Sequence, residues 1–230
     1  MQTPPFTRLL TLTAALCAGS AFTSRAALVT LTGGDPGEGF APLALTFAAM
    51  NLGSPVGFTV QGVNFAASSP NITFTAPFAV ETSYNPFAPT TANDAALRAI
   101  GATQVFNVAP FTLTISNLDL GTLYQVDSFI GAAFNAATEQ VSALGLTTAN
   151  DAVPLSPAGV FYDVRQTLQP DATGKIVLTY AATSAGGGTI RTFLNGISVT
   201  SAAPPVVPEP GTALFGLALL GTALTRRARR

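Results

Sequence analysis

Alternating apolar and polar residues recur through the middle of the chain and predict β-strands. Phe111–Ile115 places three large apolar side chains on one face and threonines on the other, and residues 72–75 put Ile72 and Phe74 together. Successive side chains of a strand point to opposite faces, so each segment predicts a strand with one buried face. Similar strands are predicted over residues 28–31, 58–65, 124–130, 160–168, 175–181 and 190–200.

Glycine-rich segments interrupt this pattern. Residues 33–39 and 186–188 are rich in glycine and are predicted to be loops. A single glycine inside a strand often marks a bulge, so Gly62 predicts a bulge within residues 58–65. Turn signals therefore separate many short strands.

One short helix is predicted over residues 94–100. Asn93 or Asp94 supplies a side-chain cap, and Gly101 ends the helix. Short strands with regular turns and a single helix predict an all-β fold, an antiparallel β-sandwich, over residues 27–203.

The first 26 residues have the layout of a secretory signal peptide, which we expect to be helical. Arg8 precedes a short apolar stretch at residues 9–18, and small residues follow it. We predict that signal peptidase cuts between Ala26 and Ala27. The weaker alternatives are a cut near residues 19–21 and lipidation of Cys17, which the large residue Leu16 before it disfavours.

The C-terminal end divides into three parts with different physical properties. Residues 204–211 form a proline-rich linker that cannot be helical. Residues 212–225 are uncharged, rich in alanine and leucine, and predict a hydrophobic transmembrane or sorting helix. Residues 226–230 form a basic tail, and such a cluster stays on the cytoplasmic side of a membrane. The linker's motif is Val207, Pro208, Glu209 and Pro210, and the tail's cations are Arg226, Arg227, Arg229 and Arg230.

This order of motif, apolar segment and arginine cluster resembles the PEP-CTERM sorting signal of Gram-negative bacteria. The resemblance implies that a membrane protease, an exosortase, recognises the tail and that the protein is exported. It implies transient insertion in the inner membrane, then a place at the cell surface or in the extracellular matrix. A permanent anchor is the alternative, although a helix over residues 211–225 would extend only about 22 Å, against about 30 Å of hydrocarbon.

Composition excludes several classes of function. The region between the two terminal signals contains four basic and ten acidic residues, which gives a net charge of −6. So few cations cannot neutralise a phosphate backbone, so we expect no nucleic-acid partner. The chain has no histidine, which rules out His-dependent triads and His-ligated metal sites.

Two predicted strands, Phe111–Ile115 and Tyr124–Ile130, are joined by a turn, and Leu118, Gly121 and Tyr124 follow one another at intervals of three residues. The segment from Phe111 to Ile130 resembles a hairpin of jelly-roll domains. These are the galactose-binding-like and malectin-like domains, and the resemblance implies a jelly-roll-like sandwich. Gly121 permits the turn, and Leu118 and Tyr124 can pack over the end of the sheet.

The hexapeptide Thr-Thr-Ala-Asn-Asp-Ala occurs twice, at residues 90–95 and 147–152. The simpler interpretation is a pair of Asx-capped turns. The alternative is that Asn93 and Asp94 act together with Asn150 and Asp151 in binding one ligand or a calcium ion.

Acidic side chains suggest two further candidate sites, one for calcium binding and one for catalysis. Asp35 and Glu38 form the densest local acidic cluster and are the candidate ligands of a calcium ion. Apart from this calcium ion, we expect no cofactor. Asp127 and Asp163 are candidates for a catalytic acid pair of a glycan hydrolase or lyase. We expect instead a protein without enzymatic activity, associated with exopolysaccharide. A passive structural role in the envelope is a third interpretation.

Overall fold

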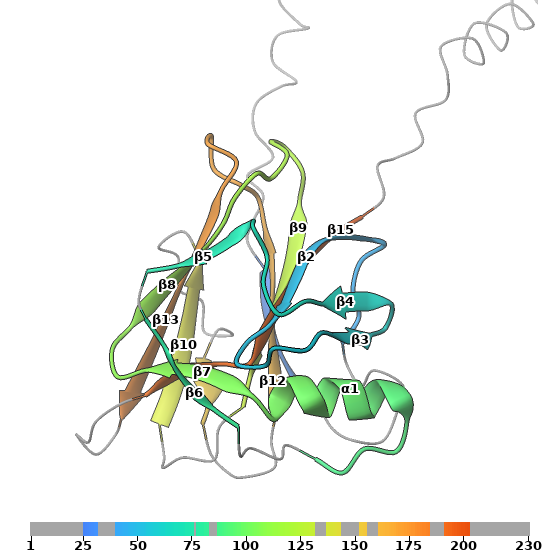
Figure 1. The fold of residues 1–230 in the computed structure, drawn as a ribbon. Helices are drawn as coiled ribbons and strands as arrows, with labels where there is room; N and C mark the ends of the chain where they lie inside the picture. Colours follow the sequence, from blue (N-terminus) through green and yellow to red (C-terminus); the bar gives the residue numbers. More distant parts are fainter. Residues whose placement is uncertain are drawn as a thin grey trace, which may run out of the picture.

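The computed structural model describes residues 25–31, 40–75, 77–82, 87–131, 137–143, 152–155, 161–184 and 191–202. Two five-stranded sheets pack face to face (Figure 1). The prediction of an antiparallel β-sandwich with one short helix is confirmed. Of the predicted signal helix over residues 1–26, residues 1–24 lie outside the described residues, whereas Arg25 and Ala26 belong to a strand, so the prediction of helix is wrong there. The predicted helix over residues 212–225 also lies outside the described residues, and within the described ones no helix is long and apolar enough to span a membrane.

The two sheets are built from strands distant in sequence, with every neighbouring pair antiparallel. The first sheet has the order β1 (Arg25–Leu31), β12 (Phe161–Leu168), β9 (Tyr124–Ile130), β15 (Gly196–Ser201) and β2 (Leu45–Asn51). The second sheet has the order β11 (Ala152–Pro154), β10 (Ala137–Ala143), β13 (Ile176–Ser184), β8 (Phe111–Ile115) and β5 (Ile72–Phe74).

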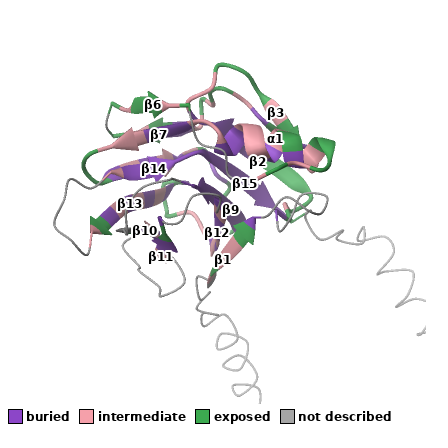
Figure 2. Ribbon diagram, turned by 90° about the horizontal axis from the view of Figure 1, so that it is seen from below, coloured by how far each residue is buried: buried purple, intermediate pink, exposed green. Residues whose placement is uncertain are grey.

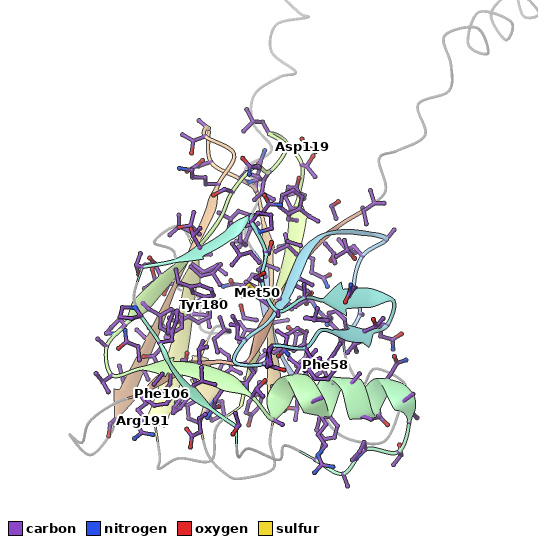
Figure 3. All side chains as sticks on the ribbon, in the orientation of Figure 1. Met50, Phe58, Phe106, Asp119, Tyr180 and Arg191 are labelled. Carbon is purple, nitrogen blue, oxygen red and sulfur yellow. The ribbon has the colours of Figure 1, made fainter. Side chains whose placement is uncertain are left out.

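The main core fills the space between these sheets. Strand alternation sends Leu113 and Leu178 inward from the second sheet and Val126 from the first, and all three are fully buried. Tyr180 crosses this core: its ring stacks on Phe111 with centroids 4.9 Å apart. Its hydroxyl lies 2.8 Å from Oγ of Ser128, which satisfies both polar groups in the apolar interior (Figure 3).

A second core covers the outer face of the first sheet. The helix α1 (Ala92–Gly101) and the hairpin of β3 (Phe58–Val60) and β4 (Val63–Phe65) lie over it (Figure 1). Leu97 and Ile100 of the helix are fully buried. The helix approaches the sheet so closely that a Cβ on Gly196 would lie 2.8 Å from Ile100 Cγ2.

A three-stranded sheet closes one end of the sandwich. Its order is β14 (Thr192–Leu194), β7 (Gln104–Asn107) and β6 (Ala79–Glu81). Phe106 and Arg191 lie at this end, while Asp119 lies at the opposite end (Figure 3). The strand β14 is buried along its length, and β6 is largely exposed (Figure 2).

Two segments that we predicted as single strands are each divided. Residues 58–65 form the β3–β4 hairpin, because Gln61 and Gly62 adopt consecutive positive φ values of 50° and 78°, which turn the chain; the predicted bulge at Gly62 is wrong. Residues 190–200 break at Asn195, which separates β14 from β15. The Asn195 amide donates to the carbonyl oxygens of Gly101 and Thr103 and accepts from the Gly131 N–H.

The helix is longer than predicted, and its cap is a different residue. It begins at Ala92, and the N-cap is Thr91 rather than Asn93 or Asp94. Asp94 occupies the third helical position, where its carboxylate accepts from the Thr91 N–H at 2.7 Å while its own N–H donates to Thr91 Oγ1 at 3.1 Å. This reciprocal pair is a capping box.

Candidate functional site

The two acids singled out from the sequence meet on the outer face of the first sheet. Asp163 and Arg165 lie two residues apart on β12 and therefore share a face. The register places Arg165 directly opposite Asp127 on β9, and Asp127 opposite Ser198 on β15. Sheet geometry thus gathers one cation and two acids; we call Asp127, Asp163 and Arg165 the acid–arginine cluster.

Arg165 joins the two carboxylates. Its Nε donates to Asp127 Oδ1 at 2.9 Å, and its Nη2 donates to Asp163 Oδ2 at 2.8 Å. Both acids are fully buried, while the arginine side chain is 22% exposed. Asp127 also accepts from Gln125 Nε2 at 3.1 Å and from Ser198 Oγ at 3.0 Å. Hydrogen bonds therefore occupy both oxygens of Asp127.

The surroundings of Asp163 disfavour its charged form. Burial and the neighbouring carboxylate of Asp127 raise the pKa of Asp163 well above its usual value, against the opposing influence of Arg165. Its Oδ1 is buried and has no hydrogen-bond partner among the described residues. Arg165 is the cation that both buried carboxyl groups contact. Such a contact reduces the cost of burying a carboxylate charge.

The geometry of the acid–arginine cluster is that of a structural cross-link between neighbouring strands. Acids that cleave a glycosidic bond flank the sugar across about 5 to 10 Å, but here a single guanidinium occupies the space between them. The cluster links β9, β12 and β15 through side chains beneath the segment at Ala41, whose carbonyl oxygen accepts from Gln125 Nε2 at 2.8 Å. Sequence reasoning found both acids but missed Arg165, which only the cross-strand register reveals.

The first copy of the repeated hexapeptide is occupied by local contacts. Asp94 Oδ2 accepts from the N–H and hydroxyl of Thr90 as well as from Thr91. Burial alone would raise the pKa of Asp94, but the hydrogen bonds from Thr90 and Thr91 lower it on balance. Asn93 Oδ1 accepts from the Gln61 N–H at 3.3 Å. These contacts agree with the simpler interpretation of a capped turn; the second copy, except Ala152, lies outside the described residues.

The other predicted sites are placed as follows. Asp35 and Glu38, the candidate calcium ligands, lie outside the described residues, and so do the sorting motif from Val207 to Pro210 and the arginines from Arg226 to Arg230. Among the described residues no three His, Cys, Asp or Glu side chains come together as a metal site would require. Ala26 and Ala27 lie in β1, opposite Gln166 and Arg165. Cleavage between them stays a prediction, and it would leave a strand that starts at Ala27.

Sequence reasoning missed a buried acid at the closed end of the sandwich. Glu139 lies on the inward face of β10 in line with Val141, is fully buried, and accepts from the Phe193 N–H at 2.9 Å. Burial raises the pKa of Glu139 well above its usual value of 4.5, despite that hydrogen bond. The alternation of residues 138–143, with Glu139 at an apolar position, was the available signal.

A family model identifies the end of the chain. It describes the PEP-CTERM protein-sorting motif and matches residues 206–230. This chain carries a PEP-CTERM sorting motif. The PEP-CTERM motif implies that the protein is exported to the cell surface and that an exosortase processes it. No curated protein matches the sequence.

Comparison with solved structures shows the fold of the domain before the PEP-CTERM motif. The plant receptor-like kinase ANX2 superposes with a TM-score of 0.54 at 13% identity, over 71% of this chain and 51% of that chain. The ANXUR1 extracellular domain from Arabidopsis thaliana gives 0.52 at 13% identity, over 71% and 51%. β-Glucuronidase 2 from Bacteroides uniformis gives 0.50 at 16% identity, over 68% of this chain and 18% of the enzyme. The chain spans about half the length of these two receptor chains, and the likeness concerns fold alone.

The predicted jelly-roll hairpin lies at β8, β9 and the turn between them. Gly121 has a φ of +81°, and Leu118 and Tyr124 are buried. The Tyr124 hydroxyl accepts from the Asp119 N–H at 3.0 Å, which fixes the turn between β8 and β9. The predicted resemblance to malectin-like domains is therefore confirmed for the fold.

Proposed function

We propose that this protein is a non-catalytic module of the cell surface or extracellular matrix, which binds exopolysaccharide through its β-sandwich. The observation that carries the proposal is the PEP-CTERM motif at residues 206–230, placed directly after a sandwich domain. The motif delivers the domain to the outside of the cell, where polysaccharide is the abundant polymer. Passage through the inner membrane is transient in this proposal and ends when the exosortase cuts the tail.

The state of the buried acids among the described residues supports a non-catalytic role. General acid catalysis requires a carboxyl group that reaches the substrate. Asp127 and Asp163 are fully buried and share Arg165, and Glu139 is enclosed in the core. Asp94 is occupied by the helix cap. In this proposal these four buried acids affect the stability of the fold and do not contact a substrate.

The distribution of cations supports a partner other than nucleic acid. Arg165 belongs to the acid–arginine cluster, and Arg191 lies 4.6 Å from the ring centre of Phe106 and 3.9 Å from a Glu81 oxygen. Arg98 is on α1, and Lys175 precedes β13 at the far end of the second sheet. The domain's four basic residues are thus dispersed, whereas phosphate binding needs them on one surface.

The proposal is tested in the native host by separating the exopolysaccharide from cells and medium. We expect the exported protein to sediment with the polysaccharide and to be released when the polymer is digested enzymatically. Recovery of the protein only in the polymer-free medium would contradict the proposal. Incubation of the purified protein with the same polysaccharide should create no new reducing ends, and their appearance would establish a glycan hydrolase or lyase instead.

A further inference from the structure

Among the described residues, the outer face of the second sheet is partly exposed and has an unusual composition. Alternation along β8 and β13 buries Phe111, Leu113 and Leu178 and turns their neighbours to solvent. The outward positions of β5, β8, β10 and β13 carry threonines, which define what we call the threonine face: Thr73, Thr112, Thr114, Thr138, Thr179 and Thr183. The first sheet's outer face, by contrast, is covered by α1 and the β3–β4 hairpin (Figure 1).

The strand register places these threonines opposite one another. Thr73 pairs with Thr114 across β5 and β8, and Thr112 pairs with Thr179 across β8 and β13. Thr138 pairs with Thr183 across β10 and β13. Directly opposite side chains lie about 5 Å apart, and alternate residues along a strand lie about 6.6 Å apart. Hydroxyl and methyl groups therefore repeat across the sheet in two directions.

No ionisable side chain stands among the outward positions of these four strands. Their remaining members are Gln140, Ser142, Val177 and Ala181, which are partly exposed. An exposed sheet face of a soluble protein usually carries charged residues. Charged residues make up only 9% of the chain, against about 25% in an average globular protein, and none of the described ones stands on this face.

We propose that the threonine face binds an uncharged polysaccharide. A threonine hydroxyl can donate and accept hydrogen bonds with sugar hydroxyls. Its methyl group can pack on the apolar C–H faces of sugar rings. Because the face holds no ions, a neutral chain can bind without the desolvation of any charge. The inference rests on the proposed function and names the surface and the ligand class for it.

Charge complementarity selects this occupant over an anionic polymer. A polyuronate or sulphated chain would need cations on the surface, and the basic residue nearest in sequence to a face strand, Lys175, lies in the turn before β13. A second copy of this chain suits the face less well, because the buried centres of homodimer interfaces are rich in apolar side chains. Here the corresponding positions carry hydroxyl groups.

The test uses the exported protein and the host's own exopolysaccharide, separated on an anion exchanger into uncharged and anionic fractions. Affinity electrophoresis in gels containing each fraction gives the dissociation constants. We expect the uncharged fraction to retard the protein, and Thr179→Lys to weaken that binding at least tenfold. Thr179→Val, which keeps the shape and loses the hydroxyl, should weaken it by a smaller factor. Thr59→Lys, at an exposed threonine of β3 outside the face, is the matched control and should bind as the unaltered protein does.

The outcomes separate the inference from the proposed function. Unchanged binding by Thr179→Lys, with its melting temperature preserved, would overturn the threonine face and leave polysaccharide binding standing. Retardation by the anionic fraction alone would overturn the ligand class. Failure of both fractions to bind would remove the proposed function together with the inference. A dimer in light scattering that Thr179→Lys dissociates would assign the face to self-association and overturn the inference.

Discussion

The Nε of Arg165 lies 2.9 Å from Oδ1 of Asp127, directly across the junction of β12 and β9. The same guanidinium reaches Asp163, so one cation serves two buried acids. Asp127 and Asp163, the two acids that the sequence suggested as a catalytic pair, are therefore bound to a structural arginine.

Replacement of Arg165 by methionine tests this role. Two buried acids would lose their cation, and breaking a buried pair from one side costs about 3 to 5 kcal/mol. We expect the free energy of unfolding, measured by urea titration, to fall by about that amount. Lys175→Met, at an exposed surface cation, is the control and should cost less than about 0.5 kcal/mol. Adding Asp127→Asn to Arg165→Met should restore part of the loss; a loss below about 1 kcal/mol for Arg165→Met alone would contradict the account.

Glu139 predicts a dependence of stability on pH. The pKa of this acid is raised in the folded state, so the folded protein retains a proton that the unfolded chain loses above its ordinary value of 4.5. The contribution of Glu139 to stability therefore declines as the pH rises from 4.5 toward the folded-state pKa. Glu139→Gln should be more stable than the unaltered protein at pH 8 and nearly equal to it below pH 4.5. Equal stability at both pH values would show that Glu139 titrates normally.

Two glycines with positive φ should respond differently to alanine. Gly121 has a φ of +81° and open space around its Cβ position, so Gly121→Ala should cost about 1 kcal/mol from the backbone alone. At Gly174, with a φ of +71°, a Cβ would lie 2.8 Å from the Leu118 carbonyl oxygen. Gly174→Ala should cost at least about 1 kcal/mol more, because it disturbs the Leu118 N–H bond to the Gly174 carbonyl oxygen. Thermal unfolding of both variants measures the difference, and equal costs would contradict the predicted crowding.

The capping box predicts a local effect on α1. Thr91→Ala removes the N-cap hydroxyl and should lower the free energy of unfolding by about 1 kcal/mol. Asp94→Ala should cost more, because its carboxylate accepts three hydrogen bonds from Thr90 and Thr91. The pKa of Asp94 is lowered, so its contribution is present above the ordinary value of 3.8 and is lost as the pH falls below it. Thr59→Ala, on the exposed side of β3, is the control. If it lowers the free energy of unfolding as much as Thr91→Ala does, the effect of Thr91→Ala is not specific to the helix cap.

Much of the fold follows from alternation in the sequence. The predicted bounds of Phe111–Ile115 and Tyr124–Ile130 agree with β8 and β9, because each strand lies between clear turn signals. The strand β8 buries one face, and β9 is buried on both. Leu45–Asn51, the strand β2, was missed because alanine and methionine weaken its β-signal. The break at Asn195 was also missed, because its amide bonds to Gly101, 94 residues away.

The candidate site shows the same division between local and distant information. Asp127 and Asp163 could be named from the sequence as acids within predicted strands. Their shared partner Arg165 depends on the pairing of β9 with β12, which brings together residues 38 positions apart. The alternation of residues 138–143 indicates the face of Glu139, but its neighbours across the sheet are set by the register of β10 with β13. Chemistry at a β-sheet site is therefore set by pairing that local patterns do not specify.

In the function proposed above, the PEP-CTERM motif directs processing and release of the β-sandwich outside the cell. The most direct test is the intact mass of the protein recovered from fractions of its native host, compared with a strain that lacks the exosortase. We predict a C-terminus near residues 208–210 in the exported fraction, without the arginine tail, and a full-length C-terminus in the membranes of the mutant strain. A full-length C-terminus in the membranes of the unaltered host would contradict the account and make the protein an anchored component of the envelope.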